Sequence, residues 1–388
     1  LKIYKEVIFM STILIKNGTL IDGSGSKRYL ADILIENEKI KKIGKLDLTA
    51  DKVIDASGKI VSPGFIDTHS HSDLKVLIEP FVEPKIRQGI TTEILGQDGI
   101  SMAPLPEEYV SSWRKNLAGL DGDSDELKWD WKNTDGYLNL ISKTGSGPNE
   151  LYLVPHGNIR MEAMGLEARV ATKEELEKMK EITRREMEAG VAGLSTGLIY
   201  IPCAYAETEE LIEICKVAAE YGRPLVIHQR SEADTMLESM QEVIRIVKES
   251  GVKIHFSHFK ICGQKNWKLI EPVIALLDKC KEEGINVSYD QYPYVAGSTM
   301  LGVILPPWAH AGGTDKLIER LKDKSLREKM KKDIIEGIPG WDNFIDFAGF
   351  DGIYVTSVKT DKNQDCIGKN LTEIAELRGK EKFDAVFD

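Results

Sequence analysis

Apolar and polar residues alternate in short segments over residues 12–60, as expected for β-strands separated by turns. The segments TILIKNGTLID, ADILIENEKIKKIG and KVIDASGKIV each combine β-branched residues with Gly, Asn or Asp breaks. The pattern predicts a small β-domain over residues 1–61, ahead of a main domain over residues 62–388.

From residue 63 onward the pattern changes to a repeated order of strand, loop and helix. Seven segments have the composition of buried strands: 64–68, 91–96, 150–154, 192–196, 224–228, 252–258 and 285–290. Alternating strands and helices predict a parallel sheet with right-handed crossovers. Seven such strands, with metal-binding residue types at their carboxyl ends, favour a (β/α)8 TIM barrel over an open sheet.

Several connecting segments have the pattern of helices. Thr172 and Glu175 form the signature of a capping box, ahead of a charged helix that ends near Gly190. Two more helices are predicted from apolar residues at helical spacing: Leu237, Met240, Ile244 and Val247 in one, and Ile270, Val273, Ile274 and Leu277 in the other. Residues 101–148, rich in Trp, Asp and Gly, are interpreted as an elaborated loop over the barrel mouth.

Composition narrows the function classes. The chain has 388 residues, 42% of them apolar, so a substantial core can be buried. A net charge of −11 argues against a nucleic-acid partner, since binding to a polyanion needs clustered Lys and Arg. Five cysteines without a CxxC pair indicate a reduced, cytoplasmic compartment. No apolar run is long enough to cross a membrane, and the first ten residues lack a secretory cleavage site.

Four of the seven histidines fall at the ends of predicted strands. His69 and His71 are two residues apart after FIDT, so their side chains can point the same way. His228 ends the segment RPLVIH, and His258 ends VKIHFSH about one strand–helix repeat later. A single histidine is most often a packed or surface residue, but four at the same edge of a sheet indicate a metal centre.

These residues also carry a resemblance to a known family. PGFIDTHSH, followed by the two later histidines, resembles the amidohydrolase superfamily. The segments GQDGISMAP, GLSTGLIYIPCAYAETEEL, HFSHFK and DQYPYVAGSTM narrow it to the N-acyl-D-amino-acid deacylase (D-aminoacylase) family, over about residues 13–388. The resemblance implies a β-sandwich beside a TIM barrel, with one or two zinc ions at the barrel mouth.

By this resemblance, His69, His71, His228 and His258 would be metal ligands. A further ligand in the family is a cysteine in a GNCG-type loop, where this chain reads GQDG and has Asp98. A carboxylate tolerates other divalent metals as well as zinc, and Asp98 can bridge two of them. The alternative reading of Asp98 is that it only stabilises a turn between two glycines.

The resemblance also implies the reaction and the residues that bind substrate. A metal-activated water would hydrolyse an N-acyl-D-amino acid to a carboxylate and a free D-amino acid. Lys260, Tyr292 and Ser298 would hold the substrate carboxylate, and His156 would lie near the site as a substrate or ligand partner. The family's general-base aspartate lies in an SDG motif at strand 8, which this sequence lacks, so we expect it after residue 388. We therefore expect a barrel that lacks strand 8, and weak folding or turnover of this polypeptide alone.

Two other functions stay open from the sequence. A cyclic-amide hydrolase of the hydantoinase or dihydroorotase type is one, although GLSTG has no lysine where many barrel amidohydrolases carry a metal-bridging one. A fold-only binding protein is the other: the expected aspartate is missing, but the histidines are all present. A small N-acyl amino acid is the expected partner. The sequence does not fix the oligomeric state, the acyl group or the side-chain preference.

Overall fold

The computed structural model describes residues 11–388, so the expectation about a secretory signal lies outside the described residues. The chain forms two compact units, the first ending at Phe65 and the second comprising Ile66–Asp388. The sequence-based division placed the boundary after residue 61, at the end of strand β5 (Ile60–Val61).

The first unit is a five-stranded sheet. β1 (Thr12–Leu20) lies between β2 (Tyr29–Glu36) and β4 (Lys52–Asp55), β3 (Lys39–Gly44) pairs with β2, and β5 pairs with β1. The β1–β2 pair is antiparallel, whereas β4 and β5 run parallel to β1. Its apolar core is small and centres on Leu20, Ala31 and Ile33.

The second unit contains a curled seven-stranded sheet, which confirms the seven strands predicted from the sequence. Its strands are β6 (Phe65–Asp67), β7 (Ile90–Leu95), β8 (Asn149–Pro155), β9 (Gly193–Gly197), β10 (Pro224–His228), β11 (Lys253–Phe256) and β12 (Val287–Tyr289). They lie in chain order, and the pairs from β7 to β12 are parallel. Sequential parallel strands put their carboxyl ends at one edge, as in a TIM barrel. Within residues 11–388, β6 and β12 are the two ends of the sheet.

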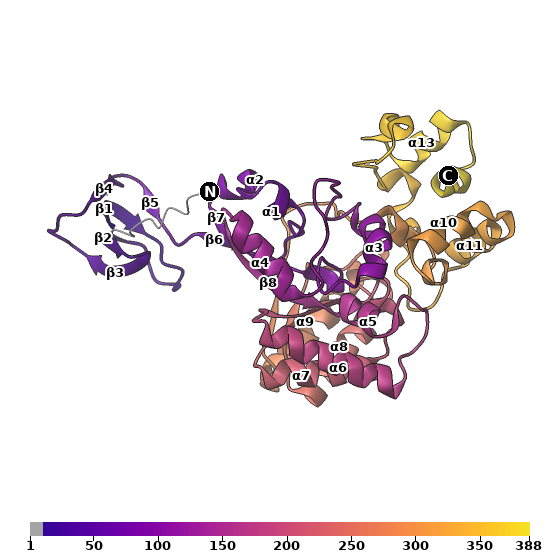
Figure 1. The fold of residues 1–388 in the computed structure, drawn as a ribbon, viewed down its shortest axis with the longest axis horizontal. Coiled ribbons are helices and arrows are strands. Elements are labelled where there is room, and N and C mark those ends of the chain that lie inside the picture. Colours follow the sequence, from indigo (N-terminus) through magenta and orange to yellow (C-terminus); the bar gives the residue numbers. More distant parts are fainter. Residues whose placement is uncertain (1–10) are drawn as a thin grey trace. The chain divides into compact units, whose positions relative to one another are not determined.

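The connecting helices pack along this sheet (Figure 1). They are α5 (His156–Met164), α6 (Lys173–Glu188), α7 (Thr208–Glu220), α8 (Met236–Ser250) and α9 (Ile270–Glu282). The capping box predicted at α6 is confirmed, because the Thr172 side chain accepts from the Glu175 amide and the Glu175 side chain accepts from the Thr172 amide. The predicted apolar face of α9 is only partly right: Val273 is buried, but Ile270 and Ile274 are exposed, since α9 lies beside the last strand β12.

Residues 101–148 are more structured than the predicted loop. They contain α3 (Val110–Leu117) and α4 (Thr134–Thr144), and four aromatic side chains of the segment are buried: Trp113, Trp129, Trp131 and Tyr137. The indole of Trp113 donates to the Ser101 carbonyl, the indole of Trp131 donates to the Met102 carbonyl, and the Tyr137 hydroxyl donates to the Asp73 carbonyl. The first two bonds hold the segment together, and the Tyr137 bond connects it to Asp73, which lies outside the segment.

The remaining helices are short or lie toward the carboxyl end. They are α1 (Lys75–Ile78), α2 (Glu83–Ile86), α10 (Thr314–Lys322), α11 (Lys324–Glu336), α12 (Phe344–Ala348), α13 (Leu371–Arg378) and α14 (Lys382–Phe387). The carboxyl-terminal helices share an apolar cluster of their own, separate from the barrel core. Among the helices of residues 11–388, none combines the length and the hydropathy that crossing a bilayer requires.

We expect Thr172→Ala to lower the free energy of unfolding by about 1 kcal/mol, because the first turn of α6 loses its side-chain acceptor. The shift in the denaturant midpoint measures this loss. The matched control is Lys173→Ala, at an exposed neighbouring position that takes no part in the capping box. Equal shifts for both variants would contradict a capping role for Thr172.

Candidate metal centre

Four histidines meet at the carboxyl edge of the seven-stranded sheet. His69 and His71 follow β6, His228 is the last residue of β10, and His258 follows β11 by two residues. The ring centroids of His69 and His258 are 4.9 Å apart, those of His228 and His258 are 4.5 Å apart, and those of His69 and His71 are 5.3 Å apart. Residues far apart in the chain thus come together because parallel strands end at the same edge.

The carboxylate of Asp98 lies between two pairs of imidazoles. Its Oδ2 atom is 3.5 Å from His69 Nε2 and 3.3 Å from His71 Nε2. Its Oδ1 atom is 3.5 Å from His258 Nε2 and 4.0 Å from His228 Nδ1. One carboxylate therefore faces both histidine pairs, each through a different oxygen.

The charges in this cluster depend strongly on one another. Burial opposes ionisation of Asp98, but the surrounding imidazoles, His69 foremost, hold its pKa well below the usual range. Burial lowers the pKa of His228 to about 3, so this ring is neutral at pH 7 and has a free lone pair. Burial also opposes the charge on His258, but the nearby Glu232 carboxylate outweighs it and raises the pKa of His258 to about 9.

The unused polar atoms of the cluster fit a divalent cation. Asp98 Oδ1 and His228 Nε2 are buried and lack a hydrogen-bond partner within the described residues. Unsatisfied buried polar atoms are rare in proteins because they cost free energy. The ligand atoms form three groups, each with its atoms within 4.8 Å of one another. Asp98 joins His69 and His71 in one group and His228 and His258 in another, and the third group consists of His71, Asp73 and Asp121. Imidazole and carboxylate are suitable ligands for zinc and several other divalent metals.

A glycine-flanked turn after β7 presents Asp98 to the histidines. Asp98 has φ 56°, in the left-handed region, and Gly96 has φ 77°. The Ser195 hydroxyl on β9 donates to the Gly96 carbonyl and accepts from the Gly99 amide at 3.2 Å. A Cβ atom on Gly96 would lie 2.1 Å from the Leu153 carbonyl oxygen, so only glycine fits there. Ser195 therefore fixes both ends of the turn, and the Asp98 side chain points at the imidazoles.

Three carboxylates that sequence reasoning missed lie behind the histidines. Glu232 Oε1 is 3.0 Å from His258 Nδ1, Asp121 Oδ1 is 3.3 Å from His71 Nδ1, and Asp290 Oδ2 is 3.7 Å from His69 Nδ1. Asp290 directly follows β12, so the strand-end rule that selected the histidines also selects it. Glu232 and Asp121 lie in connecting segments, where no local pattern marks them.

The predicted substrate residues are only partly brought together. The Lys260 ammonium donates to Glu232 Oε2 at 2.6 Å and lies 5.5 Å from the centroid of the Tyr292 ring. Burial opposes the charge on Glu232, but His228 and Lys260 outweigh it and hold the pKa of Glu232 at about 2. Ser298 is exposed and makes no side-chain hydrogen bond within the described part of the chain.

The structure engages both ring nitrogens of His156, the predicted substrate or ligand partner, in a buried network. His156 is fully buried, with Nδ1 2.9 Å from Thr196 Oγ1 and Nε2 2.8 Å from Glu210 Oε1. Arg160 also donates to Glu210, at 3.0 Å. With both ring nitrogens engaged in this internal network, His156 has no nitrogen left for substrate.

The fold and this cluster define a class: a barrel-type α/β protein with a candidate metal centre at the carboxyl ends of its strands. The chain belongs to the amidohydrolase family, whose model matches residues 52–278. It is 36% identical over 290 residues to the D-aminoacylase of Alcaligenes xylosoxydans xylosoxydans, a match that covers 74% of this chain and 58% of that enzyme. The chain therefore spans little more than half of the length of this curated relative.

Two solved structures support the same family. The N-acyl-D-glutamate deacylase of Bordetella bronchiseptica, complexed with zinc and a phosphonate mimic of the tetrahedral intermediate, superposes with a TM-score of 0.79 at 31% identity. That superposition covers 97% of this chain and 69% of the deacylase. A D-aminoacylase structure with a binuclear metal centre gives a TM-score of 0.76 at 30% identity, covering 96% of this chain and 69% of the other.

We expect Gly96→Ala to destabilise the protein by more than the about 1–2 kcal/mol that a left-handed conformation costs an ordinary residue. The added Cβ would also overlap the Leu153 carbonyl oxygen. Denaturant unfolding measures the loss. Gly122→Ala is the matched control, because Gly122 has φ +85° but nothing within 4 Å of its Cβ position. If the two variants lose the same stability, close packing at Gly96 is not important.

Proposed function

We propose that this protein is a metal-dependent amidohydrolase that cleaves N-acyl-D-amino acids into a carboxylate and a free D-amino acid. The observation that carries the proposal is the Asp98 carboxylate, which lies between two pairs of imidazoles and faces each pair with a different oxygen. The relatives named above, a D-aminoacylase and an N-acyl-D-glutamate deacylase, support the reaction and the D preference.

Two metal positions are available in this arrangement. His69, His71 and Asp98 would hold one ion, and Asp98, His228 and His258 would hold the other. We propose zinc, which the deacylase relative contains, with Asp98 as the shared ligand. When bound, the metal supplies Lewis acidity that activates water and polarises the amide carbonyl.

The cationic side chain beside the site is suited to a substrate carboxylate. Lys260 is held by Glu232, but its side chain keeps 30% exposure, so the ammonium can donate to a ligand as well. Tyr292 lies on the same side of the site as Lys260. We propose that Lys260 and Tyr292 bind the substrate carboxylate, with Ser298 as a further hydroxyl donor.

Neither Asp290 nor Glu232 is free to act as the general base. Asp290 accepts from the His258 amide at 2.5 Å and lies 2.9 Å from His255 Nε2. Glu232 is held by Lys260 and His258. The general-base aspartate expected after residue 388 stays a prediction. A cyclic-amide hydrolase gains no support, because β9 reads GLSTG without lysine and its Ser195 fixes the Asp98 turn.

We further propose a small-molecule partner and a reducing, cytoplasmic compartment. The net charge of −11 disfavours a nucleic-acid partner. All five cysteines are free in the structure, in keeping with a reducing environment.

We expect His228→Ala to abolish tight binding at one of the two metal positions, because it removes a neutral imidazole ligand. Metal analysis of the purified protein after dialysis measures this. His310→Gln is the control, since His310 lies outside the cluster and bonds to the Gly302 carbonyl. Metal-free wild-type protein after dialysis against zinc would contradict the proposed centre.

We expect Asp98→Asn to weaken zinc binding by at least about tenfold, which corresponds to about 1.4 kcal/mol. The amide keeps the size of the side chain but removes the negative charge that faces the four imidazoles. Chelator competition measures the affinity. An unchanged affinity would mean that Asp98 only shapes its turn.

We expect hydrolysis of N-acetyl-D-methionine to stop when a chelator removes the metal and to resume when zinc is added back. The L enantiomer serves as the specificity control in the same assay. Hydrolysis that persists in metal-free protein would contradict a metal-dependent reaction, and equal rates for both enantiomers would contradict the D preference.

A further inference from the structure

The carboxylate of Asp121 lies beside the His71 ring and close to the Asp73 carboxylate. Asp121 follows α3, and its side chain is fully buried. Neither carboxylate oxygen makes a hydrogen bond within the described residues, while Oδ1 lies 3.3 Å from His71 Nδ1. A buried carboxylate without partners is costly, so its place beside an imidazole needs a physical reason.

The surroundings of two other histidines indicate why a buried carboxylate lies beside the His71 ring. His258 has Glu232 at its Nδ1 atom, and His69 has Asp290 at its Nδ1 atom. In His69, His71 and His258 alike, the opposite nitrogen, Nε2, faces Asp98. A carboxylate at Nδ1 keeps the ring proton there and leaves the Nε2 lone pair for a metal.

We propose that Asp121 is a positioning residue for His71, accepting the Nδ1 proton so that Nε2 is directed at the metal position shared with His69 and Asp98. This inference rests on the proposed function, because the orientation has a role only if His71 binds a metal. It gives residues 101–148 a part in the site through the Asp121 side chain.

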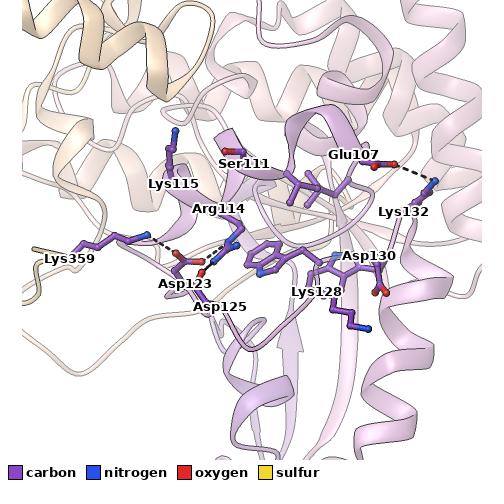
Figure 2. Close-up of a pocket in the computed structure, with 14 residues that line it drawn as sticks. Glu107, Ser111, Arg114, Lys115, Asp123, Asp125, Lys128, Asp130, Lys132 and Lys359 are labelled. Carbon is purple, nitrogen blue, oxygen red and sulfur yellow. Dashed lines mark hydrogen bonds and ion pairs between the residues drawn. The ribbon is translucent and has the colours of Figure 1, made fainter.

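Both flanks of Asp121 are fixed in place. On one side, the Asp121 amide donates to the Leu117 carbonyl at the end of α3, at 2.9 Å. On the other side, Asp123 accepts from Arg114 Nε at 2.8 Å and from Lys359 Nζ at 2.8 Å. Figure 2 shows Arg114 and Lys359 converging on Asp123 at the wall of a cavity of about 600 Å³. The segment is thus anchored two residues away from the carboxylate that reaches His71.

The neighbouring acidic residue Asp73 has a different contact. Its Oδ1 atom accepts from the Gly96 amide at 2.8 Å and from the Ser101 hydroxyl. Asp73 therefore supports the turn that presents Asp98, whereas Asp121 has no such backbone contact to its carboxylate. Asp73 thus supports the turn that carries Asp98, and Asp121 supports the His71 ring.

The test is zinc affinity in Asp121→Ala and Asp121→Asn, measured by chelator competition on the full chain. We expect Asp121→Ala to weaken one of the two zinc positions by about 10–100-fold. Asp121→Asn should weaken zinc binding less, near the lower end of that range, since its amide oxygen still accepts a hydrogen bond. Asp130→Asn is the matched control in the same segment, and its zinc affinity should stay within about twofold of wild type, because Asp130 is exposed and lies outside the contacts that anchor Asp121.

Two further readouts separate positioning from simple structural support. The absorption spectrum of the cobalt-substituted protein should change in Asp121→Asn and stay unchanged in Asp130→Asn. In a His71→Ala background, Asp121→Asn should have no further effect on zinc affinity. If the Asp121→Ala protein does not fold, the zinc affinity and the cobalt spectrum are both measured on the Asp121→Asn protein.

The outcomes are distinct. Wild-type protein that binds no zinc would remove the proposed function itself. Zinc bound normally by wild type and equally well by both Asp121 variants would overturn only the role of Asp121. Loss of one whole zinc equivalent in Asp121→Asn, with the His71→Ala protein still sensitive to that change, would also overturn it, because Asp121 would then be a ligand in its own right.

Discussion

The contact between the buried Asp98 carboxylate and four imidazoles is the constraint on which the rest of the structure depends. A carboxylate that is almost entirely removed from water needs compensating positive charge or hydrogen bonds. His69 and His71 provide this compensation on one side of the carboxylate, and His228 and His258 provide it on the other side. The same arrangement leaves possible ligand atoms without hydrogen-bond partners, and two divalent ions bound at this place would use them.

The sheet and the turn after β7 both serve this contact. The carboxyl ends of β6, β10 and β11 lie at one edge of the sheet; two histidines follow β6, one ends β10 and one follows β11. Asp98 reaches the same point through a left-handed turn that needs glycine at residue 96 and is held by Ser195. Strand order thus decides where the imidazoles lie, and close backbone packing decides where the carboxylate lies.

An outer set of carboxylates then directs the rings. Glu232 contacts His258 and also the Lys260 ammonium, so one buried anion connects a proposed metal ligand with the residue proposed to bind substrate. Asp290 contacts His69 and accepts from the His258 amide. Second-layer carboxylates of this kind fix the ring nitrogen that faces the metal and raise ligand basicity.

The sequence by itself determined the seven strands, the capping box of α6 and the family, because hydrophobic periodicity, caps and strand-end histidines are local patterns. It did not reveal the helices α3 and α4 within residues 101–148, whose buried Trp113 and Trp131 find their partners only in the folded chain. Only the tertiary structure placed Asp121 and Glu232 behind the histidines and engaged His156 with Thr196 and Glu210. Those contacts join residues from separate connecting segments, and a pattern along the chain carries no information about which segments meet in space.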